Sequence, residues 1–60
     1  MNTELIPIER ARTERLGGIS RVLLYKLVNR GDLKKVNIGR RSFILSDSID
    51  AYIESLREAA

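Results

Sequence analysis

The absence of both cysteine and histidine is the feature that most constrains this 60-residue chain. Without them it can form no disulfide, and it lacks the common zinc-ligand sets. So short a chain buries little of its surface, and its stability must come from one small core of leucine, isoleucine and valine. We expect a single domain over residues 6–60. Residues 1–5 show no pattern and are expected to be frayed.

The charges are unevenly distributed along the chain. Residues 15–41 carry a net charge of +7 and the remainder −4, for a total of +3. This pattern predicts a polyanion-binding face, although a soluble surface with uneven charge explains it equally well. No apolar run approaches the ~20 residues of a membrane span, and residues 1–9 lack the features of a signal peptide. A soluble protein without membrane contact is predicted, and the lack of cysteine suits the cytoplasm.

Two helices separated by a glycine pair are predicted in the first half of the chain. The first begins near Pro7, which is favoured in a first helical turn, and ends at Gly17-Gly18. Ser20 suits the N-cap of the second helix, which ends at Gly31. The apolar stripe of this second helix consists of Leu24, Leu27 and Val28. Two helices joined by such a turn have the outline of a helix-turn-helix.

A β-hairpin and a third helix are predicted in the second half. Apolar and polar residues alternate over 35–38, a glycine-containing turn follows, and 43–45 is apolar again. Ser46 suits the N-cap of the last helix. The stripe expected to cover the first two helices consists of Ile49, Tyr52, Ile53 and Leu56. The predicted fold is α+β and mostly helical, in the order helix, helix, β-hairpin, helix.

Three segments of the chain resemble a known family. Residues 19–33 resemble its recognition segment, residues 36–41 (Val-Asn-Ile-Gly-Arg-Arg) its wing, and residues 48–53 (Ser-Ile-Asp-Ala-Tyr-Ile) its closing helix. Three such segments in the right order are fairly specific. Together they resemble the excisionase branch of the MerR-like winged helix-turn-helix proteins, over roughly residues 6–53.

This resemblance implies a recombination directionality factor. Such a protein binds attachment sites in phage or mobile-element DNA, often as adjacent copies, and bends the duplex. The bent DNA promotes integrase-mediated excision and disfavours integration. The implied partners are double-stranded DNA, an integrase and further copies of the chain, in the cytoplasm of a bacterial host at its nucleoid.

The outward face of the second helix carries the predicted major-groove contacts. Arg21 and Lys26 are candidates for base edges or phosphates, Val22 for a thymine methyl group, and the Tyr25 hydroxyl for a phosphate. The predicted recognition-helix residues are Ser20, Arg21, Val22, Tyr25, Lys26, Asn29 and Arg30. A solvated polar face is the alternative interpretation. Leu23, on the flank, can pack on the first helix or on a neighbouring subunit.

The hairpin carries the predicted wing contacts. Arg40 and Arg41 are expected at its tip, from which arginine can enter the strongly negative minor groove. Lys34 and Lys35 are expected to contact backbone phosphates. Idle surface charge is the alternative for these residues.

Enzymatic activity is not predicted. The chain lacks histidine and cysteine, a nucleophile–base pair and a phosphate-binding loop, and no cofactor or metal is expected. A small MerR-like transcriptional regulator would need the same DNA contacts as an excisionase. A protein-interaction module that uses the acidic last helix is the alternative from another class. Single-strand or RNA binding is disfavoured because three aromatic residues do not make a stacking platform.

Overall fold

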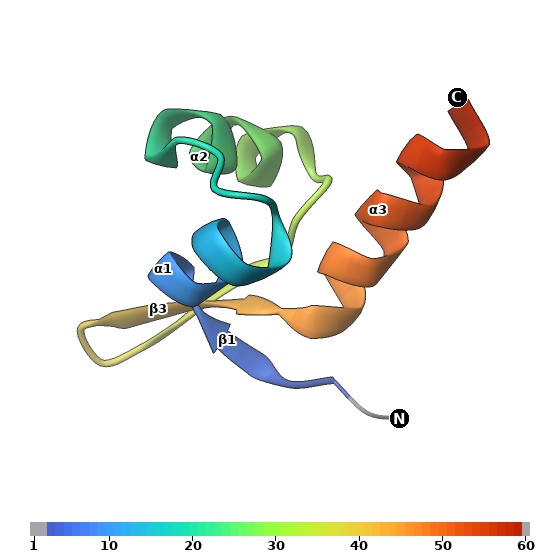
Figure 1. Cartoon of the computed structure of the whole chain (residues 1–60). Helices are drawn as coiled ribbons and strands as arrows, with labels where there is room; N and C mark the ends of the chain where they lie inside the picture. The colour runs from blue at the N-terminus through green and yellow to red at the C-terminus, as the bar shows by residue number, and fades with distance from the viewer. Residues whose placement is uncertain (1–2, 60) are drawn as a thin grey trace.

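The computed structural model describes residues 3–59 and has the predicted α+β fold with a wing-like hairpin (Figure 1). Its elements in chain order are β1 (Leu5–Pro7), α1 (Ile8–Arg10), the π-helical turn η1 (Ala11–Arg15), α2 (Arg21–Arg30), β2 (Lys35–Ile38), β3 (Arg41–Leu45) and α3 (Ser46–Ala59). The helix-turn-helix consists of η1, the Gly17-Gly18 turn and α2. The wing is the hairpin of β2 and β3.

Strand β1 was not predicted, and it corrects the expected element order. The strands form an antiparallel sheet in the order β1-β3-β2, in which Ile6 of β1 lies opposite Ile44 of β3. The Glu4 backbone N–H donates to Ser46 Oγ at 2.7 Å, and the Ser46 N–H donates to the Glu4 carbonyl at 2.9 Å. The prediction that residues 1–5 are frayed is therefore wrong for Glu4 and Leu5, while Met1 and Asn2 lie outside the described residues.

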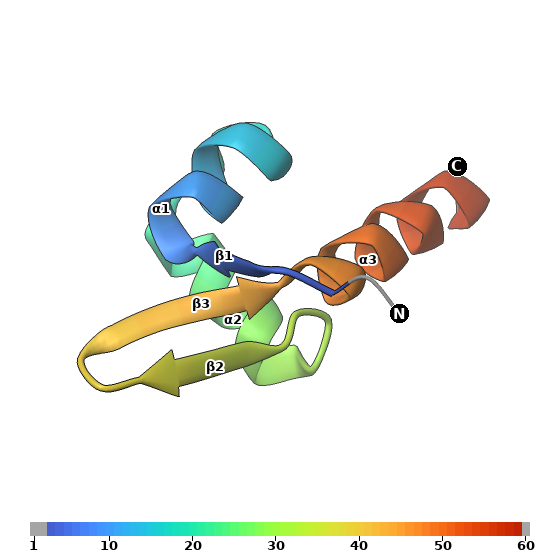
Figure 2. The same ribbon diagram turned by 90° about the horizontal axis from the view of Figure 1, so that it is seen from below.

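The core lies between the helices and one face of the sheet. It consists of Ile6, Ile8, Ala11, Leu24, Leu27, Leu33, Ile44 and Ile49. Successive strand residues point to opposite faces. The face that contains Ile44 therefore meets the helices, and the face that contains Val36 and Phe43 points away from them. In Figure 2, no helix of the described chain covers this second face.

Local signals at both ends of α2 are confirmed. The Leu23 backbone N–H donates to Ser20 Oγ at 3.1 Å, as expected of an N-cap serine. Gly31 ends the helix with a φ of 88°, a left-handed conformation that favours glycine. Leu24 and Leu27 are buried and Val28 packs against the core, so the predicted stripe is the inner face of α2.

Helix α3 follows its predicted pattern only in its first half. Ile49 is buried and Tyr52 and Ile53 pack against the core, but Leu56 is 52% exposed. The prediction of Leu56 as a core residue is wrong because α3 projects away from the sheet, as Figure 1 shows. Ser46 is already the first helical residue, and its hydroxyl accepts from Glu4 rather than from α3.

Buried Ser48 connects α3 to the hairpin, which the sequence did not reveal. Its hydroxyl donates to the Leu45 carbonyl at 2.7 Å and accepts from the Lys34 backbone N–H at 3.1 Å. Buried backbone groups need such partners. Ser48 therefore helps to set the position of the wing relative to α3.

Candidate nucleic-acid interface

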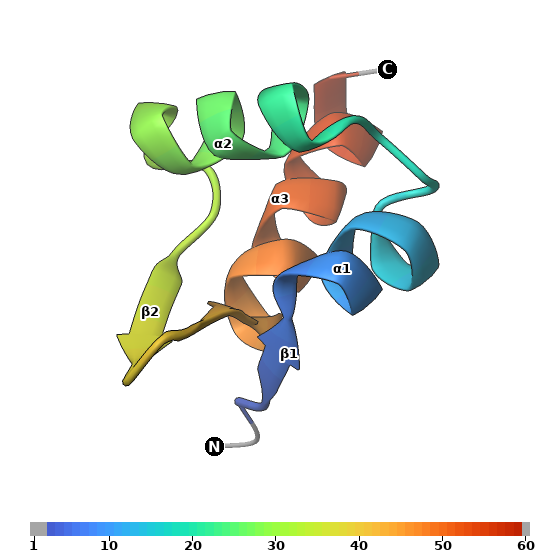
Figure 3. The same cartoon turned by 90° about the vertical axis from the view of Figure 1, so that its left-hand side faces the viewer.

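Residues of α2 and of the wing line one groove. The groove has a volume of about 390 Å³ and is open to solvent. Its lining residues are Pro7, Ile8, Glu9, Arg21, Tyr25, Arg40, Arg41 and Ser42. In Figure 3, α2 lies above and β2 of the hairpin lies below, and both face the viewer. Because Arg21 and Tyr25 of the helix and Arg40 and Arg41 of the wing line the same groove, they lie on the same side of the molecule.

The other predicted residues of α2 divide between two faces. At about 100° per residue, three of them lie on the side opposite buried Leu24. These three exposed residues are Val22, Lys26 and Asn29. Val22 is 68% exposed, although it is apolar. Arg30 lies on the flank away from the wing and pairs with Asp32, with Nε and Oδ2 3.4 Å apart. The structure does not bring Arg30 into the groove.

The two wing arginines differ in their surroundings. Arg40 follows Gly39 in the turn between β2 and β3, and it is exposed. Arg41 is the first residue of β3, and its guanidinium carbon lies 5.2 Å from the centre of the Phe43 ring. That distance is within the range of a cation–π interaction. Arg40 is therefore at the hairpin tip as predicted, whereas Arg41 belongs to β3, where its guanidinium lies beside the Phe43 ring.

Lys35 connects the wing to α2. Its Nζ lies 5.3 Å from the centre of the Tyr25 ring. This contact between two predicted DNA-binding residues links the hairpin to the helix. Lys34 is exposed at the start of the hairpin.

Most of the cations in residues 15–41 are not neutralised by the protein. Three of the eight have a carboxylate partner: Arg15 pairs with Asp50, Arg21 with Glu9 and Arg30 with Asp32. Within residues 3–59 the other five form no salt bridge, namely Lys26, Lys34, Lys35, Arg40 and Arg41. Cations without a carboxylate partner can replace the counterions of a nucleic acid.

Glu9 belongs to this site, and the sequence analysis missed it. Its Oε1 accepts from Arg12 Nη2 at 2.7 Å, and its Oε2 lies 2.8 Å from Arg21 Nε. Arg12 Nη1 also donates to the Ile19 carbonyl at 3.1 Å, in the turn before α2. The i, i+3 spacing of Glu9 and Arg12 signals the first pair. Nothing local signals the pair with Arg21, which lies in another helix.

These contacts shift two pKa values. The hydrogen bond from Arg12 is the main reason that the pKa of Glu9 is lowered, and the positive charges of Arg12 and Arg21 add to it. The hydrogen bond to Glu9 is the main reason that the pKa of Arg12 is raised. Both shifts favour the charged forms, so the three side chains behave as one ionic cluster.

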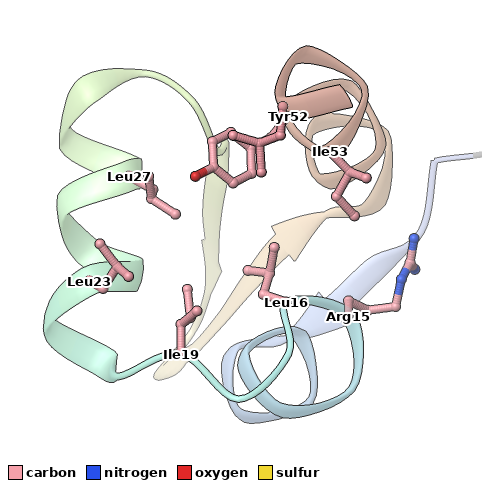
Figure 4. Close-up of a pocket in the computed structure, with 8 residues that line it drawn as sticks. Arg15, Leu16, Ile19, Leu23, Leu27, Tyr52 and Ile53 are labelled. Carbon is pink, nitrogen blue, oxygen red and sulfur yellow. The ribbon is translucent and has the colours of Figure 1, made fainter. Parts of the chain in front are cut away.

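A second hollow, of about 210 Å³, lies between α2 and α3 (Figure 4). Its lining residues are Arg15, Leu16, Ile19, Leu23, Leu27, Tyr52, Ile53 and Leu56. Leu23, which the sequence placed on the flank of α2, lines this hollow and is 42% exposed. Its lining is largely apolar.

The described part of the chain has neither a candidate metal site nor a candidate membrane span. No group of three or more potential ligands there could hold a metal ion. None of its helices has the length and apolar character needed to cross a bilayer.

The family model described as a helix-turn-helix domain matches residues 15–57, which include the turn, α2, the wing and most of α3. Neither the curated proteins nor the solved structures include a match. A helix-turn-helix domain indicates DNA binding, and such domains are typically not enzymes. The match identifies the type of domain.

Proposed function

The chain belongs to the helix-turn-helix domain family, and we propose that it binds double-stranded DNA sequence-specifically, with α2 in the major groove and the wing in the adjacent minor groove. The observation that carries this proposal is the groove shared by Arg21 and Tyr25 of α2 with Arg40 and Arg41 of the wing. A recognition helix enters the major groove, and arginine is attracted to a narrow minor groove. One duplex can meet both sets of residues because they lie on one side of the molecule.

Each group of residues has a distinct role in this proposal. Arg21 and Lys26 donate to guanine or to phosphates, and Val22 contacts a thymine methyl group. Arg40 enters the minor groove. The residues proposed to position the backbone through phosphate contacts are Ser20, Tyr25, Asn29, Arg30, Lys34, Lys35 and Arg41.

Within this family we propose an excisionase, a recombination directionality factor that acts in the nucleoid of a bacterial host. Adjacent copies would bend attachment-site DNA, promote integrase-mediated excision and disfavour integration. The support is the resemblance of residues 19–33, 36–41 and 48–53 to the three motifs of that branch. Footprinting on attachment-site DNA separates this function from transcriptional regulation. Protection of adjacent sites beside integrase sites supports the excisionase, and protection of a single promoter site supports a regulator.

The salt dependence of DNA affinity tests the binding mode. Arg40 forms no hydrogen bond or salt bridge with residues 3–59, so Arg40→Ala should leave the fold intact. The plot of log affinity against log salt concentration has a negative slope, and Arg40→Ala should make it shallower by about 0.9, the value for one lost phosphate neutralisation. The double variant Arg40→Ala, Arg41→Ala should make it shallower by about 1.8 in total.

Arg57→Ala is the matched control for Arg40→Ala. It also removes one positive charge, but Arg57 lies on α3, where its Nη1 is 3.5 Å from Glu54 Oε2. Its slope should therefore stay close to that of the unmodified protein. An unchanged slope for Arg40→Ala would refute the role of the wing. A protein that binds no duplex DNA at low salt would support the interaction module instead.

A further inference from the structure

Glu9 is the one acidic residue among those that line the groove in the described structure. A carboxylate at a surface for a polyanion weakens binding, because it repels phosphate. Its contact with Arg21 also neutralises a cation that the proposed interface uses. The position of Glu9 therefore needs a reason other than general attraction to DNA.

The salt bridge with Glu9 lies at the Nε of the Arg21 guanidinium. Glu9 Oε2 lies 2.8 Å from Nε, and the Arg21 side chain is 65% exposed. Within residues 3–59, the two terminal Nη groups of Arg21 form no hydrogen bond. These two groups are a pair of donors that can meet O6 and N7 of one guanine.

Glu9 is itself held firmly. Its other oxygen, Oε1, accepts from Arg12 Nη2 at 2.7 Å, and the Arg12 side chain is only 24% exposed. Arg12 is also fixed to the turn through the Ile19 carbonyl, at 3.1 Å. An arginine whose carboxylate partner is fixed in this way loses less conformational freedom when it binds.

We propose that Glu9 is a positioning residue for sequence discrimination: it holds Arg21 with its two terminal donors free for a guanine, and its charge disfavours the capture of Arg21 by a phosphate. This inference rests on the proposed DNA-binding function. Arginine can offer two donors to a phosphate as well as to a guanine. Because a phosphate carries a full negative charge and a guanine edge does not, the charge of Glu9 weakens the attraction of Arg21 to a phosphate more than to a guanine.

The test compares Glu9→Gln with Glu54→Gln. Both variants lose one negative charge, but Glu54 lies on α3 in an ion pair with Arg57. The unmodified protein first selects its preferred sequence from a pool of duplexes with a randomised centre. Affinities are then measured for the selected duplex and for versions in which one G·C pair at a time is replaced.

For the unmodified protein we expect one G·C pair whose replacement weakens binding by roughly 5- to 150-fold, the range for one good bidentate contact. In Glu9→Gln this ratio should fall to about threefold or less, the scale of a contact that no longer discriminates. Its affinity for unselected duplexes should rise. Glu54→Gln should leave the ratio unchanged. A merely structural role for Glu9 would weaken binding to all duplexes by one factor and also leave the ratio unchanged.

Repeating the comparison in an Arg21→Gln background shows whether Glu9 acts through Arg21. In that background, Glu9→Gln should no longer alter the ratio. The inference is overturned if Glu9→Gln keeps the full guanine preference, if its effect persists without Arg21, or if the unmodified protein enriches no sequence. These results differ from failure of the proposed function, in which the protein binds no duplex or Arg40→Ala does not alter the salt slope.

Discussion

Leu27 and Leu56 contribute to the same apolar hollow but differ in burial, and this difference leads to a quantitative prediction. Leu27, on the inner face of α2, is 2% exposed, whereas Leu56, near the end of α3, is 52% exposed. Figure 4 shows Leu27 pointing from α2 toward the hollow. The substitutions Leu27→Ala and Leu56→Ala remove the same atoms, so any difference between them reports the environment.

The buried leucine should matter far more to stability. Truncating a buried leucine to alanine costs ~2–5 kcal/mol, because a cavity adds to the lost transfer free energy. A domain of 60 residues has a total free energy of unfolding of roughly 3–9 kcal/mol. Leu27→Ala should therefore remove a large part of that stability. Leu56 is already half in water and leaves no closed cavity, so Leu56→Ala should cost ~1 kcal/mol or less.

Thermal unfolding followed by far-ultraviolet circular dichroism measures both effects. In a domain of this size, 1 kcal/mol corresponds to a shift in Tm of ~4–8 °C. Leu27→Ala should lower the Tm by ~10 °C or more, or leave the chain unfolded at 25 °C. Leu56→Ala should lower it by ~8 °C at most. Equal shifts for the two variants would refute the orientation of α2 and α3 described above.

Three further predictions concern the groove and the ends of α2. Because folding lowers the pKa of Glu9, its contribution to stability is complete above the usual value of 4.5 and is lost as the pH falls through the folded-state pKa. On acidification, the Tm of the unmodified protein should therefore drop more than the Tm of Glu9→Gln. Identical dependence of the two Tm values on pH would contradict this. Ser20→Ala removes the N-cap and should cost ~1 kcal/mol in urea denaturation, whereas an unchanged midpoint would argue against the cap. Gly31→Ala places a side chain at a φ of 88° and should cost ~1 kcal/mol or more, and a gain in Tm would show that the helix can end in another way.

Features that depend on neighbouring residues could be predicted from the sequence. The apolar stripe of α2 follows from helical periodicity, and its ends follow from Ser20 and Gly31, because capping acts within one turn. The hairpin follows from its glycine turn between apolar segments. The expected positions of Arg21 and Arg40 depend only on these elements. The placement of the two residues on one side of the molecule follows once the elements are packed.

Contacts between distant segments could not be predicted, because no local pattern encodes them. Three residues of β1 are too few to show a period. This strand exists because β3 pairs with it and because Ser46 bonds to Glu4, the residue just before it. Leu56 has helical spacing like Ile49, yet only the direction of α3 leaves it in solvent. The pair of Glu9 and Arg21 likewise joins two elements whose approach is decided by the packing of the core. The sequence by itself thus determined the helices, the turn and the basic wing, and the tertiary structure alone decided which charges meet and which apolar side chains are covered.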